Sequence, residues 1–399
     1  MKLRNKILAL ICVLLFAGFG FFFYKNWVEQ KPFGIVLILS DSLDSRTFAA
    51  ARQFENGATN RLAMEALPTT FLLRNASANS GVASSRSAAL AFSTGQIQDQ
   101  TSQTESAPSR TLKGIFEMAR ESGRMVGVVT NGEIAGAVPS AFYAPTNSDA
   151  DPAAALARAE GPDVILGGGG GALMPDIKGG TRADSRDLFL ELRRDGYDIV
   201  RSWEELQNVP TWRKPRVFGI FADGRMAYRD EGIETGSQPS LADMTRRAIQ
   251  LLQYNRRGYL LVVDAGLVRT AGEENRGERL LTEMLQVDAA VREALHYAGR
   301  NHLILVAGTT ITGGLNLNGS PPTTDRRMAL LGRSPAGTPA ISWANGPGNT
   351  AGDEPSAVAI NPAETVMGDV LGFGSAGKEQ LPGGFHSQTI IFDWIRERL

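Results

Sequence analysis

Residues Gly34–Ser42 read GIVLILSDS, an uncharged apolar run that ends in a polar turn. A continuous run of this kind is typical of a strand buried on both faces of a parallel sheet. Similar runs recur along the chain at Met125–Val129, Val164–Leu166, Val217–Phe221, Tyr259–Val263 and His302–Ala307. Their repetition predicts a sheet in which most strands are parallel.

Helical patterns alternate with these runs. Apolar residues recur at helical spacing in Leu112–Ser122 and Arg279–Ala298, and a capping box, Ser240–Asp243, opens a third helix. The alternation predicts an α/β fold with a doubly wound, mostly parallel sheet sandwiched by helices. Ligands of such folds bind beyond the carboxyl ends of the strands. These ends carry Asp41, Asp264 and Gly308.

The first 27 residues predict a membrane anchor, joined by a linker at 28–33 to one domain over 34–399. Basic residues within the first six precede an apolar stretch at 7–24. As a helix this stretch is about 27 Å long, enough to lie in and cross a lipid bilayer. The basic flank predicts a cytoplasmic N-terminus and an extracytoplasmic, periplasmic domain. A cleaved signal peptide is the alternative, but bulky Phe21–Tyr24 occupy the place of a small-residue cleavage site.

Within the domain, the stretch 313–384 is rich in Gly, Pro, Ser and Thr and shows little periodicity. We expect a loop-rich insertion with a few short elements there. The rest of the domain then supplies the core of the sheet.

The composition excludes several classes of protein. The 399 residues carry a net charge of −1, so charge gives no case for nucleic-acid binding. The one cysteine, Cys12, lies in the apolar stretch, so the domain has neither an internal disulfide nor a thiolate metal site. The three histidines are His296, His302 and His386.

The segment Gly81–Gly95, GVASSRSAALAFSTG, predicts a loop that leads into a helix of small residues. Ser85 lies just inside this turn, where unpaired N–H groups and the helix dipole attract an anion such as phosphate. A serine nucleophile needs a base, a lowered pKa or a metal ion, and the neighbours Ser84 and Arg86 supply none of these. Ser85 is therefore either a nucleophile activated from elsewhere or a helix N-cap.

In the order and spacing of its segments the chain resembles the alkaline phosphatase family, from Gly34 to the C-terminus. The resembling segments are GIVLILSDS, GVASSRSAALAFSTG, VVTNGEIAGAVPSAFYA, DVILGGGGG, PSLADMTRRAIQLL, YLLVVDAG and SWANGPG. The resemblance implies a phosphate-ester hydrolase whose serine is activated by two zinc ions and a magnesium ion.

Carried over residue by residue, the resemblance implies that part of this site is retained. Ser85 matches the nucleophile, Asp41 the first metal-binding aspartate and His386 the late zinc histidine. Asp264 stands where the family has a magnesium-binding glutamate.

At other positions the implied ligands are replaced. Arg269 and Glu273 stand for the aspartate and histidine of one zinc site, and Gly308 and Thr309 for the Asp-His pair of the other. Asp149 stands for the phosphate-binding arginine. The remaining replacements are Ser84, Gly136 and Val138.

The histidine count indicates that the metals are lost. Zinc sites of this type use imidazole and carboxylate ligands, and His386 alone is not enough to complete two of them. We therefore expect no cofactor, and zinc and magnesium only if the chain is an active hydrolase. A guanidinium beside Asp41 and Asp264 would neutralise them and repel a divalent cation. We predict that Arg269, with Arg86, replaces the metals.

These patterns leave three functions open. The one we favour is a membrane-anchored pseudoenzyme with Ser85 as a vestigial nucleophile, a structural or partner-binding subunit of a membrane protein complex. The first alternative is a divergent metal-dependent phosphomonoesterase, with Ser85 as nucleophile and a metal held by Asp41, Asp264 or His386. The second is a module that binds an anion through Arg86 and Arg269 without cleaving it.

Overall fold

The computed structural model describes residues 2–23, 33–56, 61–99, 113–145, 151–157, 161–231, 238–299, 301–319, 332–333, 337–348 and 358–399. The strands are β1 (Gly34–Ser40), β2 (Thr69–Arg74), β3 (Met125–Glu133), β4 (Val164–Gly168), β5 (Asp198–Val200), β6 (Val217–Ile220), β7 (Tyr259–Asp264), β8 (His302–Gly308), β9 (Leu315–Leu317), β10 (Ile341–Trp343), β11 (Val370–Ser375) and β12 (Gly384–Ser387). The helices are α1 (Lys2–Phe23), α2 (Ser45–Asn56), α3 (Ser85–Thr94), α4 (Ile115–Glu121), α5 (Ala137–Tyr143), α6 (Pro152–Leu156), α7 (Leu188–Arg194), α8 (Trp203–Asn208), α9 (Leu241–Leu252), α10 (Gly266–Glu273), α11 (Gly277–Tyr297) and α13 (Ile390–Arg396). Short 3-10 helices are η2 (Ala63–Ala66), η3 (Gly170–Leu173) and η4 (Asp176–Lys178).

The described strands form a ten-stranded sheet in the order β12-β2-β11-β8-β1-β7-β3-β4-β6-β5. Strand β1 is central and parallel to both neighbours, with Ile38 opposite Val263 of β7 and Val306 of β8. Among the described strands of this sheet, only β11 runs antiparallel to its neighbours, β2 and β8. The predicted doubly wound, mostly parallel architecture is confirmed.

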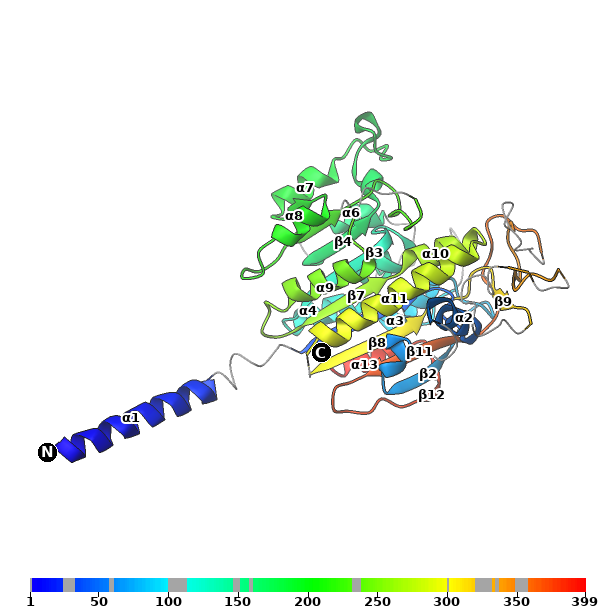
Figure 1. Cartoon of the computed structure of the whole chain (residues 1–399). Helices are drawn as coiled ribbons and strands as arrows, with labels where there is room; N and C mark the ends of the chain where they lie inside the picture. The colour runs from blue at the N-terminus through cyan, green and yellow to red at the C-terminus, as the bar shows by residue number, and fades with distance from the viewer. Residues whose placement is uncertain are drawn as a thin grey trace.

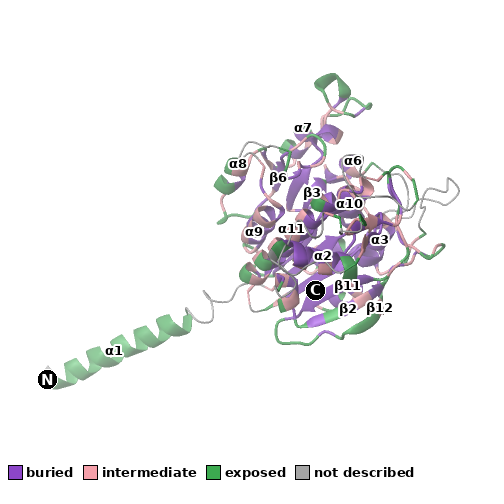
Figure 2. Cartoon of the chain, turned by 45° about the vertical axis from the view of Figure 1, so that its right-hand side comes forward, coloured by how far each residue is buried: buried purple, intermediate pink, exposed green. Residues whose placement is uncertain are grey.

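Each predicted apolar run forms a strand of this sheet, because helices cover both of its faces (Figure 1). Val36 and Ile38 of β1 belong to the core under α2, α9 and α11, whereas Ile35 and Leu37 belong to the core under α3, α4 and α13. Figure 2 shows the same result, with the central strands drawn as buried and the edge strand β12 largely exposed. Burial on both faces removes the need for alternation, which is why these runs are apolar throughout.

Strands β2 and β11 were not predicted. The stretch 313–384, predicted to be loop-rich with a few short elements, contains β11, and this strand lies inside the main sheet between β2 and β8. Its apolar pattern is interrupted by glycine at positions 372 and 374. A Cβ atom on Gly372 would overlap with the ring of Phe71 on β2, so close packing of two strands requires the residue that hides the pattern.

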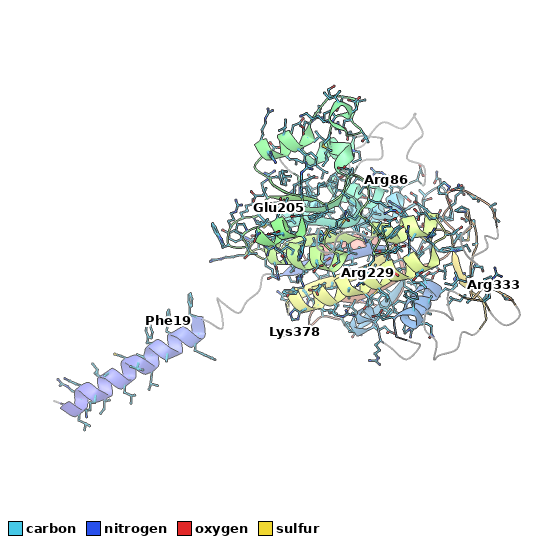
Figure 3. All side chains as sticks on the ribbon, turned by 45° about the horizontal axis from the view of Figure 1, so that its top comes forward. Phe19, Arg86, Glu205, Arg229, Arg333 and Lys378 are labelled. Atoms are coloured by element: carbon cyan, nitrogen blue, oxygen red, sulfur yellow. The ribbon has the colours of Figure 1, made fainter. Side chains whose placement is uncertain are left out.

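Helix α1 carries the predicted membrane segment. Among the described helices, it is the one long and apolar enough to cross a membrane. Its described side chains are exposed along its length, as Figure 2 shows and as Phe19 illustrates in Figure 3. The first described residue after it, Phe33, leads directly into β1. The rest of the predicted linker, 28–32, lies outside the described residues.

Candidate functional site

The predicted site residues meet at the carboxyl edge of the sheet. Asp41 follows β1, Asp264 ends β7 and Thr309 follows β8. The register places Leu39 opposite Asp264, so the two carboxylates lie on neighbouring strands. Ser85, at the start of α3, approaches them from the helical layer, and all four residues are buried.

Both carboxylate oxygens of Asp41 accept hydrogen bonds from hydroxyl groups. Ser85 Oγ donates a hydrogen bond to Asp41 Oδ2 at 2.8 Å, and Thr312 Oγ1 donates to the same oxygen at 3.4 Å. Thr309 Oγ1 donates to Asp41 Oδ1. Hydroxyl hydrogen bonds can satisfy a buried carboxylate without a metal. Thr312 was not predicted, because hydroxyl residues in a loop give no distinctive sequence signal.

Ser84, and not Ser85, is the N-cap of α3. Ser84 Oγ accepts a hydrogen bond from the backbone N–H of Ser87 at 3.1 Å, and Ser85 is the first helical residue. The alternative prediction of Ser85 as N-cap is therefore wrong. Because Ser84 fills the capping role, the hydroxyl of Ser85 is left to bond Asp41.

Arg269 is the cation of this cluster. Its Nε lies 3.6 Å from Glu273 Oε1, one turn along α10. Burial lowers the pKa of Arg269, but the charges of Asp41, Asp264, Glu273 and Glu133 outweigh this effect and raise it. In turn the charge of Arg269 lowers the pKa values of Asp41 and Asp264. The structure thus places Arg269 near enough for its charge to act on the predicted carboxylates, whereas its direct ion pair is with Glu273.

The two carboxylates still bind protons more readily than usual. Burial raises the pKa of Asp41, against the opposing effects of Arg269 and of the hydroxyl donors. Burial also raises the pKa of Asp264 to about 6, with Arg269 and the hydroxyl of Thr130 opposing it. Thr130 Oγ1 donates to Asp264 Oδ2 at 2.7 Å. One guanidinium therefore only partly compensates this set of buried acids.

His386 lies away from this cluster. It is on the edge strand β12, four strand positions from β1 and thus on the order of 19 Å away across the sheet. Its ring packs against Phe71 and Trp394, and its Nε2 lies 3.1 Å from the carbonyl oxygen of Gly383. The structure therefore does not bring the predicted zinc histidine to Asp41.

A buried polar chain extends from the site toward β12. Gln388 Nε2 donates to Asn75 Oδ1 at 3.4 Å, and Asn75 Nδ2 donates to Thr310 Oγ1 at 3.4 Å. Thr310 Oγ1 in turn donates to the carbonyl oxygen of Ala83 at 2.8 Å, just before α3. Neutral amides and hydroxyls thus connect the edge of the sheet to the loop before Ser85.

The second predicted arginine has a different place. Arg86, labelled in Figure 3, is half-buried, and its Nη1 donates to Ser140 Oγ on α5 at 2.7 Å. This bond joins α3 to α5, whereas Arg269 acts on the carboxylates. Asp149, predicted in place of the phosphate-binding arginine, lies outside the described residues.

Comparison with known proteins places the chain in a family. The family model described as alkaline phosphatase matches residues 34–347. The chain belongs to the alkaline phosphatase family. It is 27% identical to the chicken (Gallus gallus) tissue-nonspecific isozyme over 379 residues, covering 79% of this chain and 71% of the relative. It is 29% identical to streptomycin-6-phosphate phosphatase of Streptomyces griseus over 330 residues, covering 70% of this chain and 73% of the relative.

Solved structures show the same fold. A cold-active alkaline phosphatase from the psychrophile Shewanella sp. superposes with a TM-score of 0.72 at 19% identity, covering 92% of this chain and 99% of the other. The Thermus thermophilus alkaline phosphatase gives a TM-score of 0.71 at 22% identity, with 92% of each chain covered.

One further relative was found by its sequence. The membrane-bound alkaline phosphatase of Bombyx mori is 27% identical, over 79% of this chain and 67% of that protein.

The residues present do not fit the two zinc ions and one magnesium ion that membership of the alkaline phosphatase family implies. Among the described residues, no three His, Cys, Asp or Glu side chains are grouped so that they could hold a metal ion. Asp41 has hydroxyl donors on both oxygens. The guanidinium of Arg269 lies in the same cluster, and a cation there repels a second cation.

The backbone after β8 leaves no room for a larger residue at Gly308, the position at which the resemblance implies a zinc-binding aspartate. A Cβ atom at Gly308 would lie 2.5 Å from Val370 Cβ and 3.1 Å from the carbonyl oxygen of Leu43. Because Val370 is a β-branched residue at the start of β11, it has little freedom to move aside. Strand β11 therefore fills the space in which that aspartate would begin.

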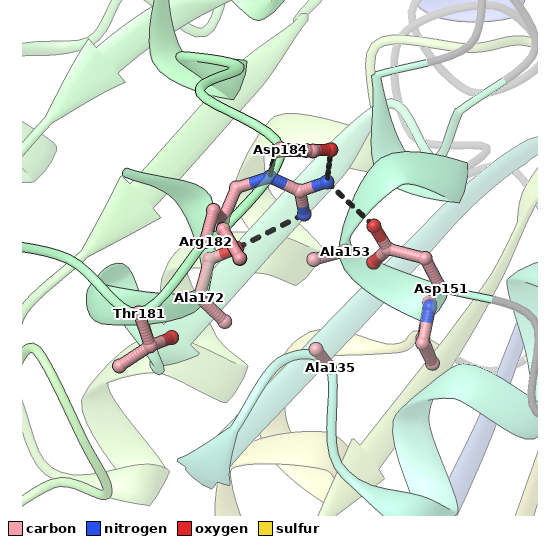
Figure 4. A pocket seen from close by; sticks show the side chains of 9 residues that line it. Ala135, Asp151, Ala153, Ala172, Thr181, Arg182 and Asp184 are labelled. Atoms are coloured by element: carbon pink, nitrogen blue, oxygen red, sulfur yellow. Dashed lines mark hydrogen bonds and ion pairs between the residues drawn. The ribbon is translucent and has the colours of Figure 1, made fainter. Parts of the chain in front are cut away.

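An open cavity elsewhere in the domain contains an arginine, but this arginine is already paired. The cavity, of about 380 Å³, lies between Asp151 and Arg182 (Figure 4). Arg182 Nη2 lies 2.6 Å from Asp151 Oδ2 and also pairs with Asp184. With two carboxylates around one guanidinium, this cavity does not supply the missing phosphate ligand.

Another cavity, of about 590 Å³, contains a buried acid that the sequence did not single out. Glu283 of α11 accepts a hydrogen bond from Asn131 Nδ2 at 2.9 Å, and Asn131 Oδ1 accepts one from the N–H of Leu267 at 3.1 Å. Burial raises the pKa of Glu283 to about 7, and the charge of Asp230 adds to this effect. Glu283 thus ties the end of β3 to α10 and α11.

Glu283 predicts a pH dependence of stability. Its folded-state pKa of about 7 exceeds the ordinary value of 4.5, so the folded state binds the proton more tightly. The contribution of Glu283 to the free energy of unfolding is therefore greatest below pH 4.5. It falls by roughly 3 kcal/mol as the pH rises from 4.5 to 7. We expect Glu283→Gln to flatten the change in the free energy of unfolding between pH 5 and 8. Glu278 is exposed on the same helix, and Glu278→Gln serves as the control. An unchanged pH profile in Glu283→Gln would refute the assignment.

Proposed function

We propose that this protein is a membrane-anchored pseudoenzyme of the alkaline phosphatase family, whose metal site has been replaced by internal hydrogen bonds and one arginine. The domain acts as a structural or partner-binding subunit of a membrane protein complex. The observation that carries this proposal is the environment of Asp41, whose two oxygens accept hydroxyl hydrogen bonds and whose charge faces Arg269.

The chemistry of Ser85 supports this proposal. Its hydroxyl donates to a carboxylate, and a carboxylate is a weak base toward an alcohol whose pKa lies far above its own. No described imidazole lies with this pair, since His386 is on the edge strand and His302 bonds Gly299 and Ser375. The serine therefore lacks the activation that a phosphoryl-transfer nucleophile requires.

The anchor and the partner belong to the same proposal. Helix α1 spans the membrane with its N-terminus in the cytoplasm, and the domain lies in the periplasm. A preserved fold around an inactive site suits a protein that works through its surface, because function resides in sites and not in the fold. A complex extracted from native membranes in mild detergent is expected to be larger than the purified chain alone. A free monomer in that extract would contradict the partner role.

The activity test compares three forms of the full chain in detergent: the native protein, Ser85→Ala and Ser93→Ala. Ser93 is a matched control, because it is a buried serine on the same helix whose hydroxyl bonds its own helix backbone. We expect hydrolysis of an aryl phosphate, with added zinc and magnesium, to be equal in all three and near background. Metal analysis is expected to find far less than one zinc per chain. Stoichiometric zinc, or activity lost only in Ser85→Ala, would establish the divergent phosphomonoesterase instead.

A further inference from the structure

A groove with five basic side chains lies at the amino edge of the sheet, opposite the candidate site. Its volume is about 830 Å³. The basic residues that line it, here called the basic groove, are Arg120, Arg124, Lys214, Arg216 and Arg256. Asp163 is the one carboxylate among the described lining residues.

The register of the sheet fixes where this groove lies. Arg124 and Arg216 directly precede β3 and β6, and Arg256 lies in the loop before β7. The first residue of β1, Gly34, is opposite Tyr259, the first residue of β7. The groove is therefore at the edge where the chain arrives from α1.

Direct contacts connect the groove to this point of entry. Arg124 Nη1 donates a hydrogen bond to the carbonyl oxygen of Phe33 at 3.0 Å. The guanidinium carbon of Arg124 also lies over the ring of Phe33, 4.8 Å from the ring centroid. Arg124 Nη2 donates to the carbonyl oxygen of Arg398 at 2.9 Å, so the C-terminus marks the same edge in Figure 1.

Chain length holds this edge near the bilayer. Nine residues, 24–32, separate the end of α1 from Phe33. Even fully extended, the ten steps from Phe23 to Phe33 reach only about 33–36 Å. Whatever path the linker takes, the amino edge stays within that distance of the membrane end of α1.

The groove keeps a positive charge on its open side. Asp163 Oδ2 accepts a hydrogen bond from the backbone N–H of Val126 at 2.9 Å. Lys214 Nζ lies 4.0 Å from Asp163 Oδ1, and 68% of the Lys214 side chain is exposed. Tyr254 lines the groove and is 47% exposed, and Trp212, two residues before Lys214, is 77% exposed. Exposed Trp and Tyr beside Lys and Arg are typical of surfaces that meet lipid headgroups.

We infer that the basic groove binds the phosphate of anionic phospholipid headgroups and holds the amino edge of the domain against the bilayer. This inference rests on the proposed membrane anchoring. Lys and Arg near an anionic surface are attracted to it over about a Debye length, roughly 8–10 Å. The carboxyl edge, with Ser85, then faces away from the membrane and is open to a partner.

The test uses the full chain in neutral detergent, titrated with short-chain phosphatidylglycerol, short-chain phosphatidylcholine or inorganic phosphate while the unfolding midpoint is followed. We expect phosphatidylglycerol to raise the midpoint, and the two other ligands to raise it little. The variant Lys214→Glu/Arg256→Glu reverses two exposed charges of the groove. It is expected to weaken the apparent affinity for phosphatidylglycerol at least about tenfold.

The matched control is Arg74→Glu/Arg229→Glu, which makes the same change in net charge with two exposed arginines at the carboxyl edge (Arg229 is labelled in Figure 3). It is expected to bind phosphatidylglycerol as the native chain does. Equal effects of both double variants, or equal shifts with phosphatidylcholine, would overturn the inference. A full shift with inorganic phosphate alone would assign the groove to a free anion and also overturn it.

Failure of the groove and failure of the anchor are separable. Alkaline carbonate treatment of membranes that contain the full chain tests the anchor, since it releases a peripheral protein and leaves a transmembrane one. A carbonate-resistant protein with no lipid preference in the titration would refute only the groove. A protein released by carbonate would refute the anchoring on which the groove rests.

Discussion

Replacing Arg269 by alanine is expected to destabilise the domain by about 3–5 kcal/mol, because it leaves buried carboxylates without their cation. Asp41, Asp264, Glu273 and Glu133 all act on this guanidinium, and the first two are buried. Without it the pKa values of Asp41 and Asp264 rise further, so the loss is expected to be larger at pH 8 than at pH 5. Urea unfolding of the full chain at both pH values measures this difference.

The control for this variant is Arg213→Ala. Arg213 and Asp198 form an ion pair that is exposed on both sides, at 47% and 41%, so its loss is expected to change stability by less than about 1 kcal/mol. Equal small effects of the two variants would show that Arg269 does not replace a metal. A pH-independent loss would show a packing role for its stem and not a charge role.

Restoring the family aspartate at position 308 is expected to fail. We expect Gly308→Asp to destabilise the domain by about 3 kcal/mol or more, because its Cβ meets Val370 and its carboxylate joins a cluster that already has excess acid. Adding Thr309→His is expected to leave zinc binding undetectable, since strand β11 occupies the space. Thermal unfolding and zinc titration of the full chain measure both results.

Two alanine variants separate the causes. Gly308→Ala introduces the clash without the charge and is expected to retain most of the destabilisation. Gly224→Ala adds a methyl group where the nearest atom, Glu133 Oε1, would lie 3.8 Å away, and is expected to be tolerated. Stable zinc binding by the Gly308→Asp/Thr309→His chain would mean that β11 yields, and that the site is lost only by substitution.

Sequence patterns predicted the centre of the fold better than its margin. The strands β1, β7 and β8 are buried on both faces, and such burial selects uninterrupted apolar residues that can be read directly. Strand β11 was missed because glycine at 372 and 374 makes room for Phe71 and Leu381. That requirement comes from a neighbouring strand distant in sequence, and no local pattern carries it.

The candidate site divides in the same way. Sequence patterns placed Asp41 and Asp264 at the carboxyl edge of the sheet, because strand ends are local features, and the family resemblance added Ser85. It also identified Arg269 as the residue that would stand among the carboxylates. It could not place His386, since the matching motif lies on an edge strand. There the imidazole of His386 packs with Phe71 and Trp394.

The sequence by itself determined the doubly wound architecture and the apolar N-terminal helix, because each depends on residue type and local order, and the family resemblance predicted which ligands are replaced. Only the tertiary structure decided what took the place of those ligands. Three hydroxyls from two separate segments, the start of α3 and the loop after β8, converge on Asp41, and Val370 fills the space beside Gly308. Such convergence depends on the packing of strands and loops far apart in the chain, and so does the joining of five basic residues into one groove.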